Sequence, residues 1–158
     1  MIQVLKQQYE LVQGSREVVL NFIDTEVGED LNKPLSAYED RTIRYLLIHT
    51  VNTYFQWLGY FAMKMPFDPL NDEDFTTIGE IRALYKQVDE LATTFLNNFS
   101  EHLNTPLDNM RSGNRRAIAT PVQLFTHVIT HEFHHKGQIM SMCRILGYIP
   151  PDTDIIRF

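Results

Sequence analysis

Apolar residues recur at intervals of three and four along most of the chain, which is the spacing of one face of an α-helix. The first such segment covers about residues 2–27 and ends at a Gly-Glu-Asp stretch. The next two begin at sequences of the form S/T-x-x-E, in which both side chains satisfy free backbone groups of a first helical turn. They predict helices over about residues 36–63, starting at Ser36, and 77–103, starting at Thr77.

The fourth helical segment has the clearest ends. Thr120 can cap its N-terminus together with Gln123, and Pro121 stands at the first helical position, where its missing N–H is not needed. Gly147 marks the C-terminus, because glycine readily adopts the left-handed conformation in which helices end. Pro150-Pro151 follow and cannot continue the helix.

Four long helices and the absence of a convincing strand pattern predict an all-α fold, a four-helix bundle, in a single domain over residues 1–158. Residues 104–119 form a polar connection between the third and fourth helices. Ser112-Gly113-Asn114 within it indicates a turn. We therefore expect either a short hairpin or an irregular loop in this connection.

Composition narrows the classes of function. The formal net charge of −6 argues against general binding of nucleic acid. No apolar run reaches the ~18 residues that a membrane helix needs, and the N-terminus lacks the basic start and apolar stretch of a secretion signal. Cys143 is the one cysteine and can form no disulfide within the chain, which suits a reducing compartment. We expect a soluble cytoplasmic protein with neither nucleic-acid nor membrane partners.

Two histidines of the fourth segment point to a metal. His131 and His135 are four residues apart, so on a helix they lie one turn apart on the same face. Leu124, Val128 and Met142 share that face, which must therefore turn toward the core. Two buried imidazoles need partners, and one metal ion satisfies both nitrogens. The alternative is a pair of core histidines bonded to backbone or water.

His49 lies midway along the second segment. Its face of that helix is polar and carries no Lys, Asp or Glu, which suits a cavity better than bulk solvent. On the residues alone, His49 is equally well interpreted as a third ligand or as an ordinary polar residue. The neighbours on its face are Tyr45, Asn52, Thr53, Gln56 and Tyr60.

The segment from His131 to His135 also matches the metallopeptidase pattern H-E-x-x-H, in which Glu132 would be the general base. The surrounding sequence fits that class poorly. No Glu follows Glu132 as a third ligand, and Gln138 and Ser141 stand where an extended form of the motif has Gly and His. An Asp from the C-terminal tail stays open as a ligand in this interpretation.

A longer set of residues resembles the DinB family of metal-binding helical bundles, over nearly the full chain. The match includes His49, the segment from Thr120-Pro121 through His127 to Ile139, then Arg144, Gly147 and Pro150 to Asp154. The resemblance implies a four-helix bundle whose metal is held by one histidine of the second helix and two of the fourth. Carried onto this chain, these are His49, His131 and His135. The family usually has Arg where this chain has Lys136.

The resemblance also implies a function. Three neutral histidines leave a divalent ion at least one open position, as in catalytic sites. Zinc and nickel both suit imidazole ligands. DinB-like proteins resemble thiol-dependent transferases, so we expect a metal-dependent enzyme acting on a small molecule, with a low-molecular-weight thiol as co-substrate. A metal-binding stress-response protein without catalysis is the alternative.

Several residues are candidates to complete the site. Candidate catalytic groups are Glu132, Tyr60 and Gln138, and candidate substrate-binding groups are Gln56, His127, Arg115 and Arg116. His127 is expected at the rim, because ligands spread over three helical turns cannot all reach one ion.

Family members are often dimers, and we expect a homodimer here. Ile129, Phe133 and Met140 form a second apolar strip on the far side of the fourth helix. That strip suits a helix-to-helix contact between subunits or packing against the 104–119 connection.

Overall fold

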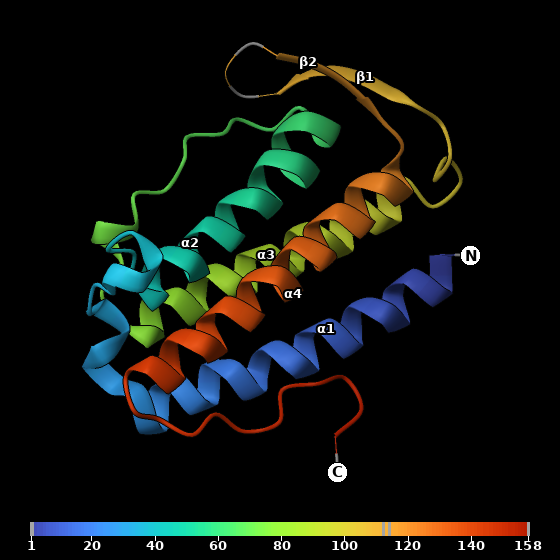
Figure 1. Ribbon diagram of the computed structural model, residues 1–158. Coiled ribbons are helices and arrows are strands. Elements are labelled where there is room, and N and C mark those ends of the chain that lie inside the picture. The colour runs from blue at the N-terminus through green and yellow to red at the C-terminus, as the bar shows by residue number, and fades with distance from the viewer. Residues whose placement is uncertain (1, 112, 114, 158) are drawn as a thin grey trace.

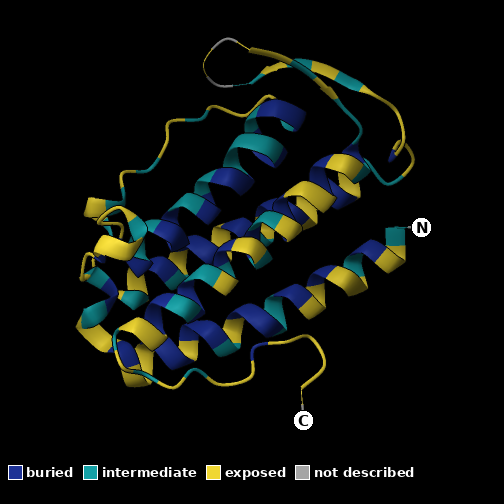
Figure 2. Ribbon diagram, viewed as in Figure 1, coloured by how far each residue is buried: buried dark blue, intermediate teal, exposed yellow. Residues whose placement is uncertain are grey.

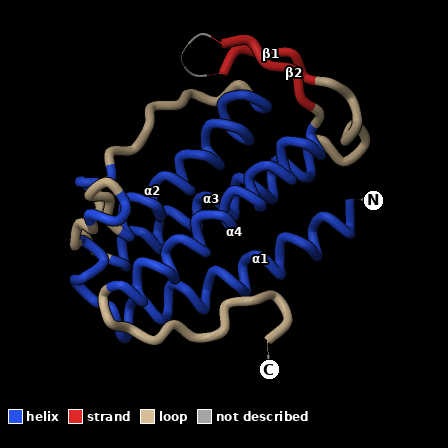
Figure 3. Tube along the Cα trace, viewed as in Figure 1, coloured by secondary structure: helices blue, strands red, loops and turns tan. Residues whose placement is uncertain are grey.

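Four long helices form the body of the molecule in the computed structural model, which describes residues 2–111, 113 and 115–157 (Figure 1). They pack lengthwise, and a small two-stranded sheet lies across one end (Figure 3). The predicted all-α bundle is therefore confirmed. The helices are α1 (Ile2–Phe22), α2 (Ile43–Tyr54), α3 (Ile78–Asn98) and α4 (Pro121–Ile145).

The inward faces of all four helices are buried, and their outward faces are exposed (Figure 2). Each large apolar side chain removed from water in this way stabilises the fold by roughly 1.5–3 kcal/mol. The largest side chains that are almost completely buried come from α2 and its continuation, from α3 and from α4; they include Tyr54, Phe61, Phe95, Phe125 and Met142.

The second helix begins later than the sequence predicts. Ser36–Tyr38 form a single 3-10 turn, after which Glu39 and Asp40 adopt left-handed backbone with φ of 56° and 58°. The helix starts at Ile43, where the Thr42 side chain accepts a hydrogen bond from the backbone N–H of Tyr45. The predicted helix start at Ser36 is wrong, because a reversal of the chain separates this serine from the helix.

A π-helical stretch, η4 (Phe55–Ala62), continues α2 to about its predicted end. A π-helix has wider turns than an α-helix, so side-chain directions along η4 do not follow the α-helical spacing counted from His49. The first helix also ends in a π-helical turn, Ile23–Val27, just before Gly28. The third helix is shorter than expected and ends at Asn98 rather than near Leu103.

The connection between α3 and α4 contains a hairpin, one of the two forms that the sequence allows. Strands β1 (Leu107–Arg111) and β2 (Arg115–Ala119) pair antiparallel, with Arg111 opposite Arg115. The Asn109 amide donates a 2.7 Å hydrogen bond to the carbonyl of Phe61, which fixes the hairpin to the end of η4. Of the predicted turn, Ser112 and Asn114 lie outside the described residues.

Local sequence sets both ends of α4. Thr120 and Gln123 form the predicted capping box. At the other end Gly147 has φ of 96°, its N–H donates to the carbonyl of Arg144, and the N–H of Tyr148 donates to that of Cys143. These two bonds make a Schellman motif. Cys143 itself is buried, and burial raises the pKa of its thiol to about 11.

The chain after α4 runs back beside α1 (Figure 1). Lys136 of α4 holds it there: its Nζ donates to the carbonyl of Thr153 at 2.7 Å and to Oγ of Ser15 at 3.0 Å. The Ser15 hydroxyl donates to the same Thr153 carbonyl. Lys136 thus joins α4, α1 and the tail.

The apolar strip expected to form a dimer interface does not lie on the surface. Ile129 and Met140 are each only 5% exposed and belong to the core of the single chain. Phe133, the third residue of the strip, is half-buried, and the homodimer stays a prediction. Within the described residues, no helix combines the length and apolar character needed to cross a membrane.

The capping box of α4 provides a test of this local analysis. Thr120→Ala removes the acceptor for the Gln123 N–H, and we expect it to lower the free energy of unfolding by about 1 kcal/mol. Urea denaturation followed by far-ultraviolet circular dichroism measures the change. Thr126→Ala, at an exposed position within α4, is the matched control and should change stability by less than ~0.5 kcal/mol. Equal losses in both variants would contradict the capping role.

Candidate metal centre

Three histidine nitrogens meet between α2 and α4. Nε2 of His131 lies 3.1 Å from Nε2 of His49 and 3.0 Å from Nε2 of His135. One nitrogen from each ring lies within 4.8 Å of the others. His49 and His131 are half-buried, and His135 is buried. The structure thus brings together the three residues predicted as ligands, including His49, which residue patterns alone left open.

The two helices position these rings by ordinary packing. α2 and α4 lie side by side, and the residues around the histidines on both helices are buried, such as Leu46 and Thr50 on α2 and Val128 and Ile139 on α4. This apolar layer holds the helices at a separation that His side chains from both sides can span.

A hydrogen bond fixes the orientation of His135. Its Nδ1 lies 2.6 Å from Oε1 of Gln138, one turn further along α4. Since an amide oxygen can only accept, Nδ1 carries the proton, and the lone pair of Nε2 points into the cluster. Metal-binding histidines usually have such a partner on the second nitrogen.

The rings favour the neutral state. Burial, with smaller contributions from the neighbouring histidines, lowers the pKa of His131 to about 4. Burial also lowers the pKa of His49, with a further contribution from the charge of Arg41. The pKa of His135 is lowered mainly by burial as well, against the opposing effect of its bond to Gln138. Neutral imidazole is the form that binds metal.

The donor set fits a divalent ion. Three nitrogens that each lie ~2.1 Å from a common ion are separated by roughly 3–3.5 Å. The distances of 3.0 and 3.1 Å fall at the short end of this range. Imidazole suits zinc and nickel, and the three rings bring no negative charge to the site.

Comparison with known proteins identifies the family of this chain. The model of the DinB family matches residues 1–158. The chain belongs to the DinB family. A curated relative, Protein DinB of Bacillus subtilis (strain 168), is 28% identical over 120 residues, which cover 72% of this chain and 69% of that protein.

Aromatic rings surround the histidines of this DinB-family chain. Tyr45 stacks on His49, with ring centroids 6.0 Å apart and planes 6° apart. The exposed His127 lies 5.6 Å from His131, ring to ring, and Trp57 packs edge-on against His127 at 5.2 Å. His127 therefore lies next to the cluster and outside it.

A cavity of about 350 Å³ lies beside these rings, between α4 and the hairpin. Both members of the Trp57–His127 pair line it, whereas none of the three clustered histidines does, so His127 lies between the cavity and the cluster. Its other walls are mostly apolar. The lining residues are Trp57, Ile118, Ala119, Gln123, Leu124 and His127.

Glu132 faces away from the histidines, toward α1. Its carboxylate accepts from Nε and Nη2 of Arg16 at 2.7 and 2.9 Å and from the Tyr54 hydroxyl at 2.6 Å. Although burial opposes the charge, Glu132 keeps the pKa of Arg16 well above its usual value. The carboxylate of the H-E-x-x-H pattern is thus engaged in a core ion pair, and this geometry gives no support to the metallopeptidase interpretation.

Sequence reasoning missed Arg16, although a signal was present. Arg16 lies four residues after Val12 and three before Val19, on the apolar face of its helix, and it is only 6% exposed. A charge on that face requires a buried partner. Arg16 has two, since its Nη1 also donates to Asp89 of α3 at 2.6 Å.

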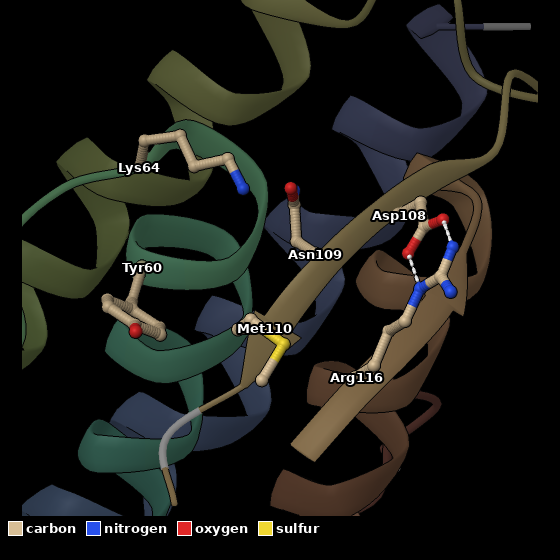
Figure 4. Close-up of a pocket in the computed structure, with 6 residues that line it drawn as sticks. All are labelled: Tyr60, Lys64, Asp108, Asn109, Met110 and Arg116. Atoms are coloured by element: carbon tan, nitrogen blue, oxygen red, sulfur yellow. Dashed lines mark hydrogen bonds and ion pairs between the residues drawn. The ribbon is translucent and has the colours of Figure 1, made fainter. Parts of the chain in front are cut away.

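Two other candidates lie away from the cluster. Tyr60 and Arg116 line a cavity of about 480 Å³ under the hairpin, together with Lys64, Asp108 and others (Figure 4). Arg116 pairs with Asp108 across the strands. None of the three clustered histidines lines this cavity. Tyr60 lies eleven residues beyond His49, which is about 16 Å along a helix, too far to reach the cluster.

Gln56 is half-buried and Arg115 is exposed. Neither has a side-chain contact that joins it to the three histidines in the described part of the chain. The candidate that the structure does bring to the cluster, besides His127, is Gln138.

The ion pair between α1 and α4 is testable. Arg16→Met leaves the buried Glu132 without its cation, and we expect a loss of about 3–5 kcal/mol in the free energy of unfolding. Because Glu132→Leu removes the unpaired buried carboxylate, the double variant Arg16→Met/Glu132→Leu should recover part of the lost free energy of unfolding. Chemical denaturation gives both values.

Arg82→Met supplies the matched control for this cycle. Arg82 pairs with the largely exposed Glu17, and such surface pairs contribute about 1 kcal/mol or less. If Arg16→Met cost no more than Arg82→Met, the buried pair would not hold α1 on α4.

Proposed function

We propose that this protein binds one divalent metal ion through Nε2 of His49, His131 and His135 and uses it in a thiol-dependent transfer to a small molecule. The observation that carries the proposal is the convergence of these three nitrogens within 4.8 Å. Zinc and nickel are the proposed metals, and a low-molecular-weight thiol is the proposed co-substrate. The proposed location is the cytoplasm.

The composition of the site supports this assignment. A divalent ion held by three neutral nitrogens would keep its full charge and at least one free position, which favours binding a thiol as thiolate. Gln138 orients His135, and the apolar layer of α2 and α4 keeps water from the inner side of the rings.

The cavity beside Trp57 and His127 is the proposed place of the second substrate. Its apolar walls suit an uncharged carbon skeleton. Partial burial, followed by the charge of Arg111, lowers the pKa of His127, which favours the neutral ring. A neutral imidazole can accept the proton that an incoming thiol gives up.

Glu132 is proposed as a structural rather than a catalytic residue. Both of its oxygens accept hydrogen bonds from Arg16 or Tyr54. A carboxylate so engaged stabilises the position of α4, and hence of the two histidines that flank it in sequence.

Elemental analysis tests the metal site. We expect the purified protein to contain about one equivalent of a divalent metal, and we expect His131→Ala/His135→Ala and His49→Ala to lose it because the remaining nitrogens bind too weakly. His102→Ala, an exposed histidine beyond the end of α3, is the control. Unchanged metal content in the double variant would show that the ion binds elsewhere.

The visible spectrum of the cobalt-substituted protein tests the open position. Added thiols should change it, because they enter the coordination sphere. If neither thiols nor anions changed the spectrum, the proposed transferase activity would be contradicted. A metal-binding protein without catalysis would then be favoured.

Gln138 gives a second prediction. Gln138→Leu removes the acceptor for Nδ1 of His135, and we expect metal affinity to fall about 10–100-fold, as measured by competition with a chelator. Gln138→Glu keeps an acceptor oxygen at this position and should retain most of the affinity. Affinity unchanged in the leucine variant would mean that the orientation of His135 does not depend on this bond.

A further inference from the structure

Arg111 stands out among the charged residues near the histidines because it lacks a partner. Among the described residues it belongs to none of the ion pairs, and its Nε is buried without a hydrogen bond. Buried donors in folded proteins are nearly always satisfied. A guanidinium left in this state requires an explanation.

The surroundings of Arg111 direct it toward the candidate site. Its Cζ lies 5.6 Å from the ring centre of Trp57, whose edge packs on His127, and His127 in turn lies beside His131. Stacking on an aromatic ring uses the flat face of a guanidinium and leaves the N–H groups at its edge free to donate. Trp57 thus holds Arg111 near the cluster without using its hydrogen bonds.

A second arginine adds to the charge. Arg115 is the cross-strand partner of Arg111, so both project from the side of the hairpin that also carries Asn109, which bonds to η4. Like charges directly opposite in a sheet destabilise it. A bound anion between or beside them would relieve that repulsion.

The site as a whole is electropositive. The charges that lower the pKa values of His49 and His127, after burial, belong to Arg41 and Arg111. Arg41 already pairs with Glu39. The nearest carboxylate along α4, Glu132, is neutralised by Arg16 on the opposite side. Within the described part of the chain, Arg111 is therefore a cation near the histidines that has no carboxylate partner.

We propose that Arg111, assisted by Arg115, binds the carboxylate of the thiol co-substrate while its sulfur lies at the histidine cluster. This inference rests on the proposed function and narrows it, since it selects thiols that carry a carboxylate over neutral thiols. Nε and one terminal nitrogen of Arg111 would donate a forked pair of hydrogen bonds to the carboxylate, which would satisfy the unpartnered Nε.

Binding of matched thiols to the cobalt-substituted protein tests the proposal. The probes are ω-mercaptoalkanoates from mercaptopropionate to mercaptooctanoate, each compared with its primary amide, and the readout is the dissociation constant from the visible spectrum. We expect the acid of at least one chain length to bind about tenfold more tightly than its amide, the effect of one charge-assisted hydrogen bond.

Substitutions assign that preference to a residue. Arg111→Gln should weaken binding of the preferred acid about tenfold and leave its amide unchanged, and Arg111→Lys, which keeps the charge and loses the fork, should give an intermediate value. Arg82→Gln is the control. It removes one positive charge from α3, where Arg82 bonds to Glu17 and Asn21, and it should change the binding of neither the acid nor the amide. Cobalt content, measured alongside, should be equal in all variants.

The outcomes separate the two levels of the proposal. If acids and amides bind equally at every length, or if Arg111→Gln weakens both alike, Arg111 does not recognise a carboxylate, although the thiol site stands. If no thiol of either kind alters the cobalt spectrum, the proposed function fails and this inference fails with it.

Discussion

The buried ion pair between Arg16 and Glu132 is the constraint to which the rest of the bundle conforms. A carboxylate in the middle of α4 can be buried only where a cation meets it, and the cation comes from α1. The Tyr54 hydroxyl and Asp89 complete the network from α2 and α3. All four helices thus contribute to one polar cluster, which ties their positions along the bundle axis to each other.

That arrangement places the carboxylate and the histidines of α4 on different sides of the helix. Glu132 turns toward α1 and is neutralised there, whereas His131 and His135 turn toward α2 and meet His49. Since adjacent residues on a helix point about 100° apart, one short segment serves both purposes. The negative charge is kept away from the histidines, and their surroundings are left to the cations Arg41 and Arg111.

Sequence patterns correctly predicted those features of the structure that depend on interactions between residues close together in the chain. The ends of α4 follow from Thr120, Gln123 and Gly147, which act within one turn of the helix, and the pairing of His131 with His135 follows from helical spacing. The contribution of His49 required knowing which helix faces which, and the family resemblance supplied it. The same kind of information was missing for Arg16, whose partners are 73 and 116 residues away.

The start of α2 was mispredicted because Ser36 has a good capping sequence, but the backbone of Leu35 pairs with that of Arg41 and closes a turn first. Tyr60 was a poor candidate because it lies about three helical turns beyond His49 and lines another cavity.

The burial of Cys143 has a consequence for a protein proposed to handle thiols. Its sulfur lies in the core and holds its proton firmly, with a pKa near 11, and thiols react as thiolates. The chain therefore does not present a competing thiol of its own to an electrophile that enters the site. It also offers no partner for a mixed disulfide with a small thiol. Oxidants or alkylating agents that modify soluble thiols would therefore leave the thiol of Cys143 unmodified.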